Sequence, residues 1–340
     1  MECYRLVWLL VEAMAHVNKL HVSGSSRMKA VDQTHQVLDA LPLLSLGVRS
    51  LALLLAIAPS IAFAQTSLQA KVAAIAKDAH GTVAVACLLP ATTLNCDLNP
   101  QSHPPMQSVF KLPLALAVLQ RVERGDFSLD QSIEFLAADC YPDTYSPLQD
   151  AHPQGGVAVP LRELLELAVG RSDNTAADIL LRVIGGPATV QASLNAMGLN
   201  AIHVRDNERT LHDDDAAQYR NDAEPAAMVA LLRLLSDQPP LSAEHTALLL
   251  RWMIESPTGP QRIKALLPPG VIVAHKTGTS GEKNGRIAAT NDVSLITLPD
   301  GRRLALAVFV TDATASQEIC EAVIARVAKA IYEHATANAP

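Results

Sequence analysis

The chain has 340 residues, of which 49% are hydrophobic and 18% charged, and its formal net charge is -7. This composition is typical of a globular protein that is long enough for one large domain or for two lobes with separate cores. No cluster of five or more lysines and arginines occurs, so nucleic acid is not an expected partner.

Residues 49–64, RSLALLLAIAPSIAFA, have the pattern of a secretory signal peptide. Arg49 supplies the positive charge, an apolar run follows, and Ala62 and Ala64 are the small residues of a cleavage site. The run is too short for a membrane anchor. We therefore expect cleavage after Ala64 and export to the periplasm. Residues 1–48 are interpreted as the product of a start site assigned too far upstream or as an unstructured leader, with a separate targeting element as the alternative.

The spacing of the apolar residues predicts the order of the elements after the signal. We expect, in chain order, a surface helix over 67–79, a hairpin whose first strand covers 81–89, an apolar helix over 109–124, and mostly helices over 130–245. Strands over 271–276, 286–298 and 302–312, with a tight turn at 299–301, and a closing helix over 318–334 should follow.

This order predicts an α/β (α+β) fold with two lobes. An antiparallel sheet flanked by helices would be built from residues 65–105 and 246–340. An all-helical lobe, residues 106–245, would be inserted between these two segments. Together they would form one domain over residues 65–340.

Two of the cysteines fall in the predicted hairpin. Cys87 closes its first strand and Cys96 lies in the returning arm, so the two residues should be about opposite each other. In an oxidising compartment this geometry permits a disulfide, and two reduced, buried thiols are the alternative. Cys140 and Cys320 have no evident partner.

The pattern S-x-x-K occurs at Ser26–Lys29, Ser108–Lys111 and Ser280–Lys283, so alone it is weak and also fits a helix cap with an exposed lysine. The context favours Ser108. Its helix is apolar, so Lys111 should share a face with it and be partly buried. A desolvated amine can act as a base. The helix N-terminus adds free N–H groups and a positive dipole. These are the features of an activated acyl-transfer nucleophile.

Two more polar elements follow in the chain. S-D-N at residues 172–174 occurs once, and because its serine and asparagine would diverge on a helix, a loop must direct both into a cleft. HKTGTSG ends the strand predicted over 271–276. There Lys276 offers a cation, Thr277 a hydroxyl, and Gly278 leaves room for a ligand beside the strand edge. Each element alone also fits an ordinary polar loop.

S-x-x-K, S-D-N and K-T-G occur here in the order typical of class A β-lactamases and penicillin-binding proteins. The steps of 64 residues from Ser108 to Ser172 and of 104 from Ser172 to Lys276 fit that family. After the signal, the chain resembles a class A serine β-lactamase over its whole length, with a loop similar to the PER-like extended-spectrum subgroup. The resemblance implies the two-lobed fold of β-lactamases and penicillin-binding proteins. It also implies a resistance hydrolase in which Ser108 is acylated, with Lys111 and Ser172 moving protons.

The resemblance further implies a carboxylate that activates water for deacylation. Glu208 occupies this place in NERTLHDDDAAQYRND, and a solvated loop acid is the alternative. His212 replaces the asparagine that commonly helps to hold the water, a departure shared with the PER-like subgroup. The run His212–Asp215 could suggest a metal site, but adjacent side chains do not converge by themselves, so an acidic loop is favoured.

Other site residues follow from the resemblance. Tyr145 in TYSPL matches the aromatic residue at the cleft entrance, and Arg262 in TGPQRIK matches the arginine that supports the substrate carboxylate beside Lys276. A packed tyrosine and a surface arginine are the alternatives. Thr279 and Ser108 would supply the backbone N–H groups of an oxyanion hole. The remaining expected substrate contacts are Asn174, Thr277 and Gly278.

The resemblance implies no cofactor, no metal and no membrane association after signal cleavage. The expected partners are small-molecule β-lactam antibiotics, cephalosporins among them, and the expected state is a monomer. The disulfide that carbapenemase-type members carry beside the nucleophile is absent, because those places hold Gln107 and Ser280. A penicillin-binding D,D-peptidase of the same fold and a non-catalytic β-lactam sensor that stays acylated are the alternatives.

Overall fold

The computed structural model describes residues 67–337. The chain divides into two units, residues 1–65 and 66–340, and every described residue belongs to the second unit. The predicted leader and signal peptide, residues 1–64, lie outside the described residues. Between residues 67 and 337 no helix is long and apolar enough to cross a membrane.

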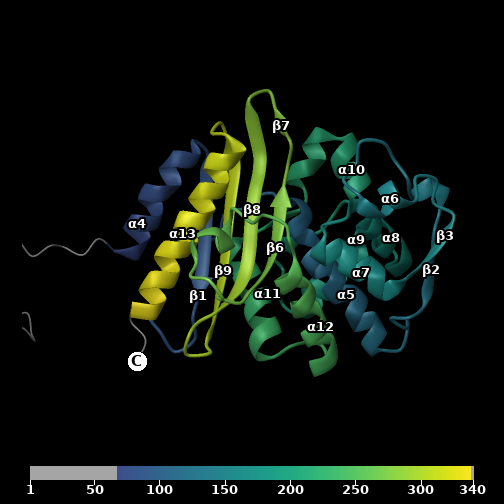
Figure 1. Ribbon diagram of the computed structural model, residues 1–340, viewed down its shortest axis with the longest axis horizontal. Coiled ribbons are helices and arrows are strands. Elements are labelled where there is room, and N and C mark those ends of the chain that lie inside the picture. The colour runs from purple at the N-terminus through teal and green to yellow at the C-terminus, as the bar shows by residue number, and fades with distance from the viewer. Residues whose placement is uncertain (1–66, 338–340) are drawn as a thin grey trace, which may run out of the picture. The chain divides into compact units, whose positions relative to one another are not determined.

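An antiparallel sheet forms the frame of the molecule, and its strands come from both ends of the described chain (Figure 1). In sheet order these are β1 (Thr82–Leu88), β9 (Arg303–Ala313), β8 (Arg286–Thr297) and β6 (Val273–Thr279), and β7 (Glu282–Lys283) also pairs with β8. The three C-terminal strands and the turn between β8 and β9 confirm the prediction from alternating apolar residues. β6, which carries K-T-G, lies at the end of this order.

Both faces of the sheet are buried, and each belongs to a different core. On β9, Leu304, Leu306 and Val308 face one core while Ala305 and Ala307 face the other, because successive side chains of a strand point to opposite faces. The first core is closed by α4 (Leu68–Ala76) and α13 (Gln317–Ala337), which lie together on one side of the sheet in Figure 1. The second core is closed by α11 (Pro225–Asp237) and by the helical part of the chain. The predicted first and last helices are thus confirmed.

The middle of the chain is mainly helical, as predicted, but it also contains strands. Its remaining helices are α5 (Lys111–Glu123), α6 (Pro147–Ala151), α7 (Leu161–Gly170), α8 (Asn174–Ile184), α9 (Pro187–Ala196), α10 (Glu208–Asp213) and α12 (Ala243–Glu255). Two small antiparallel sheets join β2 (Ser132–Phe135) to β3 (Val157–Pro160) and β4 (Ile202–His203) to β5 (Asp222–Ala223). An all-helical insertion was therefore wrong in detail, because strands of two to four residues are too short to show an alternating pattern.

Helix α5 lies at the centre of the helical part, and every residue from Lys111 to Leu119 is buried. A helix that is apolar all round is expected to be enclosed on all sides. It follows directly on a short 3₁₀ turn, Gln107–Phe110, and ends at Glu123, with Arg124 as its C-cap before Gly125, whose φ of 77° suits a glycine. This packing takes the charged head of Lys111 out of water.

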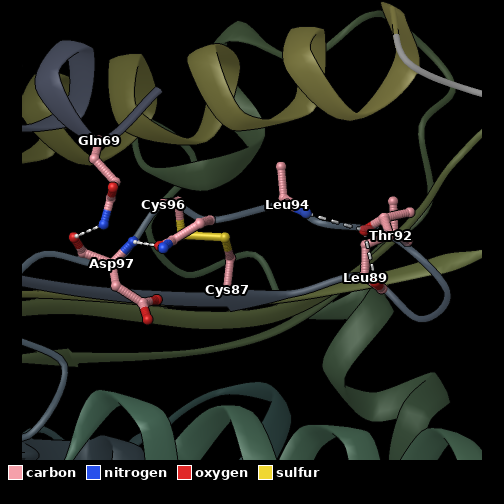
Figure 2. Close-up of a disulfide and its surroundings, with 8 residues drawn as sticks. Gln69, Cys87, Leu89, Thr92, Leu94, Cys96 and Asp97 are labelled. Carbon is pink, nitrogen blue, oxygen red and sulfur yellow. Dashed lines mark hydrogen bonds between the residues drawn. A yellow bond between two sulfur atoms is a disulfide. The ribbon is translucent and has the colours of Figure 1, made fainter. Parts of the chain in front are cut away.

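The structure joins Cys87 and Cys96 in a disulfide, so of the two alternatives the oxidised pair is the one observed (Figure 2). The returning arm is not a strand, however, and its backbone pairs with β1 at one isolated bridge, between Val85 and Leu98. In this arm Thr92 Oγ1 accepts the N–H of Leu94, and the Asn95 side chain accepts the N–H of Asp97. Such local bonds compete with strand pairing, which explains why the predicted hairpin is incomplete.

Candidate active site

Ser108 lies in the 3₁₀ turn that precedes α5, and Lys111 is the first residue of that helix. The Ser108 hydroxyl accepts a hydrogen bond from Lys111 Nζ at 2.9 Å, and Lys111 is fully buried. The residue before the serine, Gln107, has a φ of 47°, a backbone conformation that is unfavourable for a side chain of this size. The turn thus holds Ser108 in one orientation, on the same side as Lys111, as the sequence predicted.

The ammonium group of Lys111 connects three separate segments. Besides Ser108, it contacts the backbone oxygen of Ser172 at 2.7 Å, Oδ1 of Asn174 at 2.5 Å and Oε1 of Glu208 at 2.8 Å. Hydrogen bonds to several oxygens and one carboxylate compensate the loss of water around a buried ammonium. Lys111 therefore brings S-x-x-K, S-D-N and the Glu208 loop together at one point.

The S-D-N segment forms the turn into α8, and each of its residues has a different task. Ser172 adopts a φ of 62° and therefore lies outside the helical turn, whereas Asn174 is the first residue of the helix. Asp173 is buried and caps the helix, because its carboxylate accepts the N–H of Ala176 at 2.8 Å and the Ser146 hydroxyl at 2.8 Å. The prediction that a loop turns Ser172 and Asn174 toward the same site is confirmed.

Glu208 begins the short helix α10 and is buried. Its Oε1 accepts a hydrogen bond from the Ser108 hydroxyl at 3.3 Å. Asp178 of α8 fixes its backbone, since the carboxylate accepts the N–H groups of Glu208 at 2.7 Å and Arg209 at 3.0 Å. Burial, together with the nearby Glu208 carboxylate, raises the pKa of Asp178 to about 7. Asp178 was not among the predicted residues, although one acid in the apolar stretch TAADILL could have indicated it.

His212 lies one turn after Glu208 but is exposed, and its ring packs against Tyr141 with centroids 5.6 Å apart. The acidic run after it is also exposed, and Asp214 and Asp215 pair with Arg220 and Lys283. The interpretation of this segment as a solvated acidic loop rather than a metal site agrees with these contacts.

Lys276 of β6 closes the site opposite Lys111. Its Nζ donates to the Ser172 hydroxyl at 2.8 Å and to its neighbour's carbonyl, that of Thr277, at 2.9 Å. Burial, with the Lys111 ammonium nearby, lowers the pKa of Lys276 well below its usual value. Thr277 in turn bonds to Thr258 at 2.8 Å between the two hydroxyl oxygens. Ser172 therefore lies between two buried lysines, with its backbone oxygen on one and its hydroxyl on the other.

Gly278 serves a different purpose from the one predicted. A Cβ at this position would lie 2.2 Å from the carbonyl oxygen of Met106 and 3.2 Å from the N of Val109. The space beside the strand is thus filled by the backbone that leads to Ser108, not kept free for a ligand. The absence of a side chain lets β6 approach the nucleophile turn closely.

Arg262 is buried, which excludes the surface-arginine alternative. Its guanidinium donates to the Thr279 hydroxyl at 2.6 Å and to the backbone oxygen of Asn291 at 2.8 Å, and it pairs with Glu321 at 3.1 Å. The planar group thus fixes the outer end of β6 with several bonds at once. A fully buried pair that was not predicted, His275 of β6 and Asp292 of β8, has 3.0 Å between Nδ1 and Oδ1.

Seven of the predicted residues line a cleft of about 260 Å³, whereas Lys111, Glu208, Lys276, Gly278 and His212 are not among its lining residues. Its walls include Ser108, Tyr145, Ser172, Asn174, Arg262, Thr277 and Thr279. Tyr145 is 59% exposed, so it stands at the rim and is not a packed core tyrosine. A larger hollow of about 500 Å³, lined by Gln120, Arg121 and Ser193 among others, contains none of the predicted site residues. A serine hydroxyl between a buried lysine and a buried carboxylate, facing a cleft, can carry out nucleophilic acyl transfer.

Comparison with known proteins agrees with this geometry. Residues 67–335 match the model of the Beta-lactamase enzyme family. The extended-spectrum β-lactamase PER-1 of Pseudomonas aeruginosa is 43% identical, over 69% of this chain and 77% of its own length. β-Lactamase VEB-1 of the same organism is 41% identical, over 70% of this chain and 80% of its own. The solved structure of an ancestral class A β-lactamase superposes with a TM-score of 0.72 at 34% identity, over 79% of this chain and all of its own. The chain therefore belongs to the class A β-lactamase family.

Proposed function

We propose that this protein hydrolyses the β-lactam ring of penicillins and cephalosporins through an acyl-enzyme on Ser108, which water activated by Glu208 then releases. One observation carries the proposal. The Ser108 hydroxyl, on the wall of the cleft, accepts a hydrogen bond from Lys111 at 2.9 Å and donates one to Glu208 at 3.3 Å. The nucleophile is thus held by groups that can remove its proton.

In the acylation step, Ser108 Oγ forms a bond to the lactam carbonyl carbon and the C–N bond of the ring breaks. The serine proton goes to Lys111, once that amine has passed its own proton to Glu208 across the 2.8 Å contact between them, or to Glu208 through a water. The backbone N–H groups of Ser108 and Thr279 hold the oxyanion.

The leaving nitrogen needs a proton, and we assign its delivery to Ser172. Its hydroxyl lies 2.8 Å from Lys276 Nζ, whose lowered pKa favours transfer of a proton along this contact. The substrate carboxylate lies toward Lys276 and Thr277, with Arg262 as additional positive charge. Asn174 and Tyr145 complete the substrate contacts at the inner and outer ends of the cleft.

In the deacylation step, Glu208 removes a proton from water, which attacks the Ser108 ester and restores the free hydroxyl. Asp178 supports this step by fixing the backbone of Glu208. His212 is exposed and packs on Tyr141, so we assign it no contact with this water.

We further propose that the substrates include oxyimino-cephalosporins, since the loop resembles the PER-like subgroup and the relative PER-1 is named an extended-spectrum enzyme. Export by a signal peptide cleaved after Ala64, a periplasmic location and a monomeric state remain part of the proposal. One catalytic domain over residues 65–340 is likewise part of the proposal.

Turnover of a chromogenic cephalosporin by the purified protein tests the function. We expect many turnovers per chain, also in the presence of EDTA, and none with Ser108→Ala. A single stoichiometric burst followed by a stable adduct would instead identify a D,D-peptidase or a β-lactam sensor. Turnover ratios for penicillins, cephalosporins and carbapenems then define the substrate range.

A further inference from the structure

A second cluster of reactive side chains lies outside the cleft. Among the residues that the structure describes, His103, His203 and Asp222 are the one group of histidine, cysteine and acidic side chains whose ligand atoms all lie within 4.8 Å of one another. The two imidazole rings stack with centroids 5.6 Å apart. Nδ1 of each ring is 2.8 Å from the same oxygen, Oδ1 of Asp222.

We propose that this cluster is a binding site for a divalent transition-metal ion and that zinc is the preferred ion. Imidazole nitrogens and a carboxylate oxygen are the ligands that zinc prefers, whereas calcium and magnesium prefer sites made of oxygen alone. Zinc–ligand bonds of about 2.0–2.1 Å in a tetrahedron separate the ligand atoms by about 3.3 Å. Movements of about half an ångström would open the present 2.8 Å contacts to that spacing, with solvent as the fourth ligand.

Glu224 supplies the partner that a histidine ligand needs. Its Oε1 lies 3.6 Å from Nε2 of His103, the ring nitrogen that does not face Asp222. When Nδ1 binds the ion, the proton moves to Nε2, and a small approach lets it bond to Glu224. A carboxylate behind a metal-bound histidine is common, because it fixes the tautomer and the ring orientation.

The backbone around the cluster is already ordered. β4 and β5 pair His203 with Asp222, and the segment of His103 is joined to β5 by hydrogen bonds from Ala223 N to Pro104 O at 3.2 Å and from Met106 N to Asn221 O at 2.7 Å. The side chain of His103 is 48% exposed, so an ion can reach the site from solvent.

The position of the cluster suggests what the ion does. His103 comes five residues before Ser108, and His203 and Asp222 flank the loop that carries Glu208. A bound ion would hold together the segment that leads to the nucleophile and the two ends of this loop. Its role is structural, since none of the cluster residues lines the cleft.

Titration of EDTA-treated, dialysed full-length protein with ZnCl₂ at pH 7.5 tests the proposal by calorimetry. We expect one ion per chain and a rise in Tm of about 5–10 °C at a free zinc concentration of about 100 times Kd. Hydrogen exchange should slow in residues 202–223 and not in α13. The chromogenic turnover assay is a separate readout, so failure here leaves the β-lactamase proposal untouched.

Three variants and one control locate the site. His103→Ala removes a half-exposed loop side chain, so this variant should fold normally. His103→Ala and His203→Ala should each weaken zinc binding at least about tenfold. Glu224→Gln should weaken it less. His152→Ala, which removes an exposed histidine of another segment, should bind as the parent does. Absence of saturable binding, or equal affinity in His103→Ala and the parent, would mean that the cluster is only a hydrogen-bonded network.

Discussion

Replacing Gly278 by alanine should damage the active site although it adds a single methyl group. The new Cβ would lie 2.2 Å from Met106 O, and ordinary van der Waals contact begins at 3.4 Å, so β6 and the turn before Ser108 must separate by about 1 Å. The neighbour is backbone and cannot rotate away. Overpacking of this kind costs about 1–3 kcal/mol of stability. The same shift separates Ser108 from Thr279, and a misplacement of this size lowers kcat by about 100-fold.

Steady-state kinetics with a chromogenic cephalosporin, and Tm by calorimetry, measure both effects. Gly281→Ala is the matched control, because a Cβ there meets nothing within 4 Å. We expect the control to retain kcat within about twofold, since its added methyl group contacts no other atom. The reasoning would be refuted if Gly278→Ala kept both the kcat and the Tm of the parent.

Three further predictions concern Asp178, the disulfide and Arg262. Because the folded pKa of Asp178 is raised from 3.8 to about 7, the folded state holds more protons than the unfolded state between these values. The stability that Asp178 contributes is complete below about pH 4 and is lost as the pH rises through 7. The loss in free energy of unfolding is about 2–4 kcal/mol, and Asp178→Asn should abolish this pH dependence. Tm from pH 4 to 8 checks this, and parallel curves for parent and variant would contradict it. Replacing Cys87 and Cys96 by serine should lower stability by about 2–3 kcal/mol, since the bond closes a short loop of sequence separation 9, and an unchanged denaturant midpoint would argue against it. Arg262→Ala should lower kcat/KM about 10- to 100-fold, chiefly through KM, because a charged contact to the substrate carboxylate is lost; a KM equal to that of the parent would exclude this role.

The sequence predicted most of the frame because its signals were long and periodic. Apolar and polar residues alternate over many positions in the strands after residue 270, and α5 is apolar all round. Both could therefore be predicted from the sequence alone. The paired strands β4 and β5 have two residues each and left no periodic signal. The returning arm at Cys96 failed as a strand because its own side chains satisfy its backbone.

At the site, the motif residues could be predicted, but the groups that support them could not. S-x-x-K, S-D-N and K-T-G have recognisable order and spacing, and the fold brings them to one cleft. Asp178 and the buried pair of His275 and Asp292 act only through contacts between distant segments, which one sequence does not display. Gly278 was noticed for a wrong reason, since the atom that needs its space, Met106 O, lies 172 residues earlier in the chain.

The proposed mechanism rests on Ser108 as the acylated residue and Glu208 as the base of deacylation. Intact-mass spectrometry of Glu208→Ala mixed with a cephalosporin, followed by peptide mapping, tests both assignments at once. We predict a stable adduct of one acyl group per chain on Ser108, whereas the parent returns to its free mass as substrate is consumed. Turnover by Glu208→Ala at the rate of the parent, or an adduct on another residue, would contradict the mechanism.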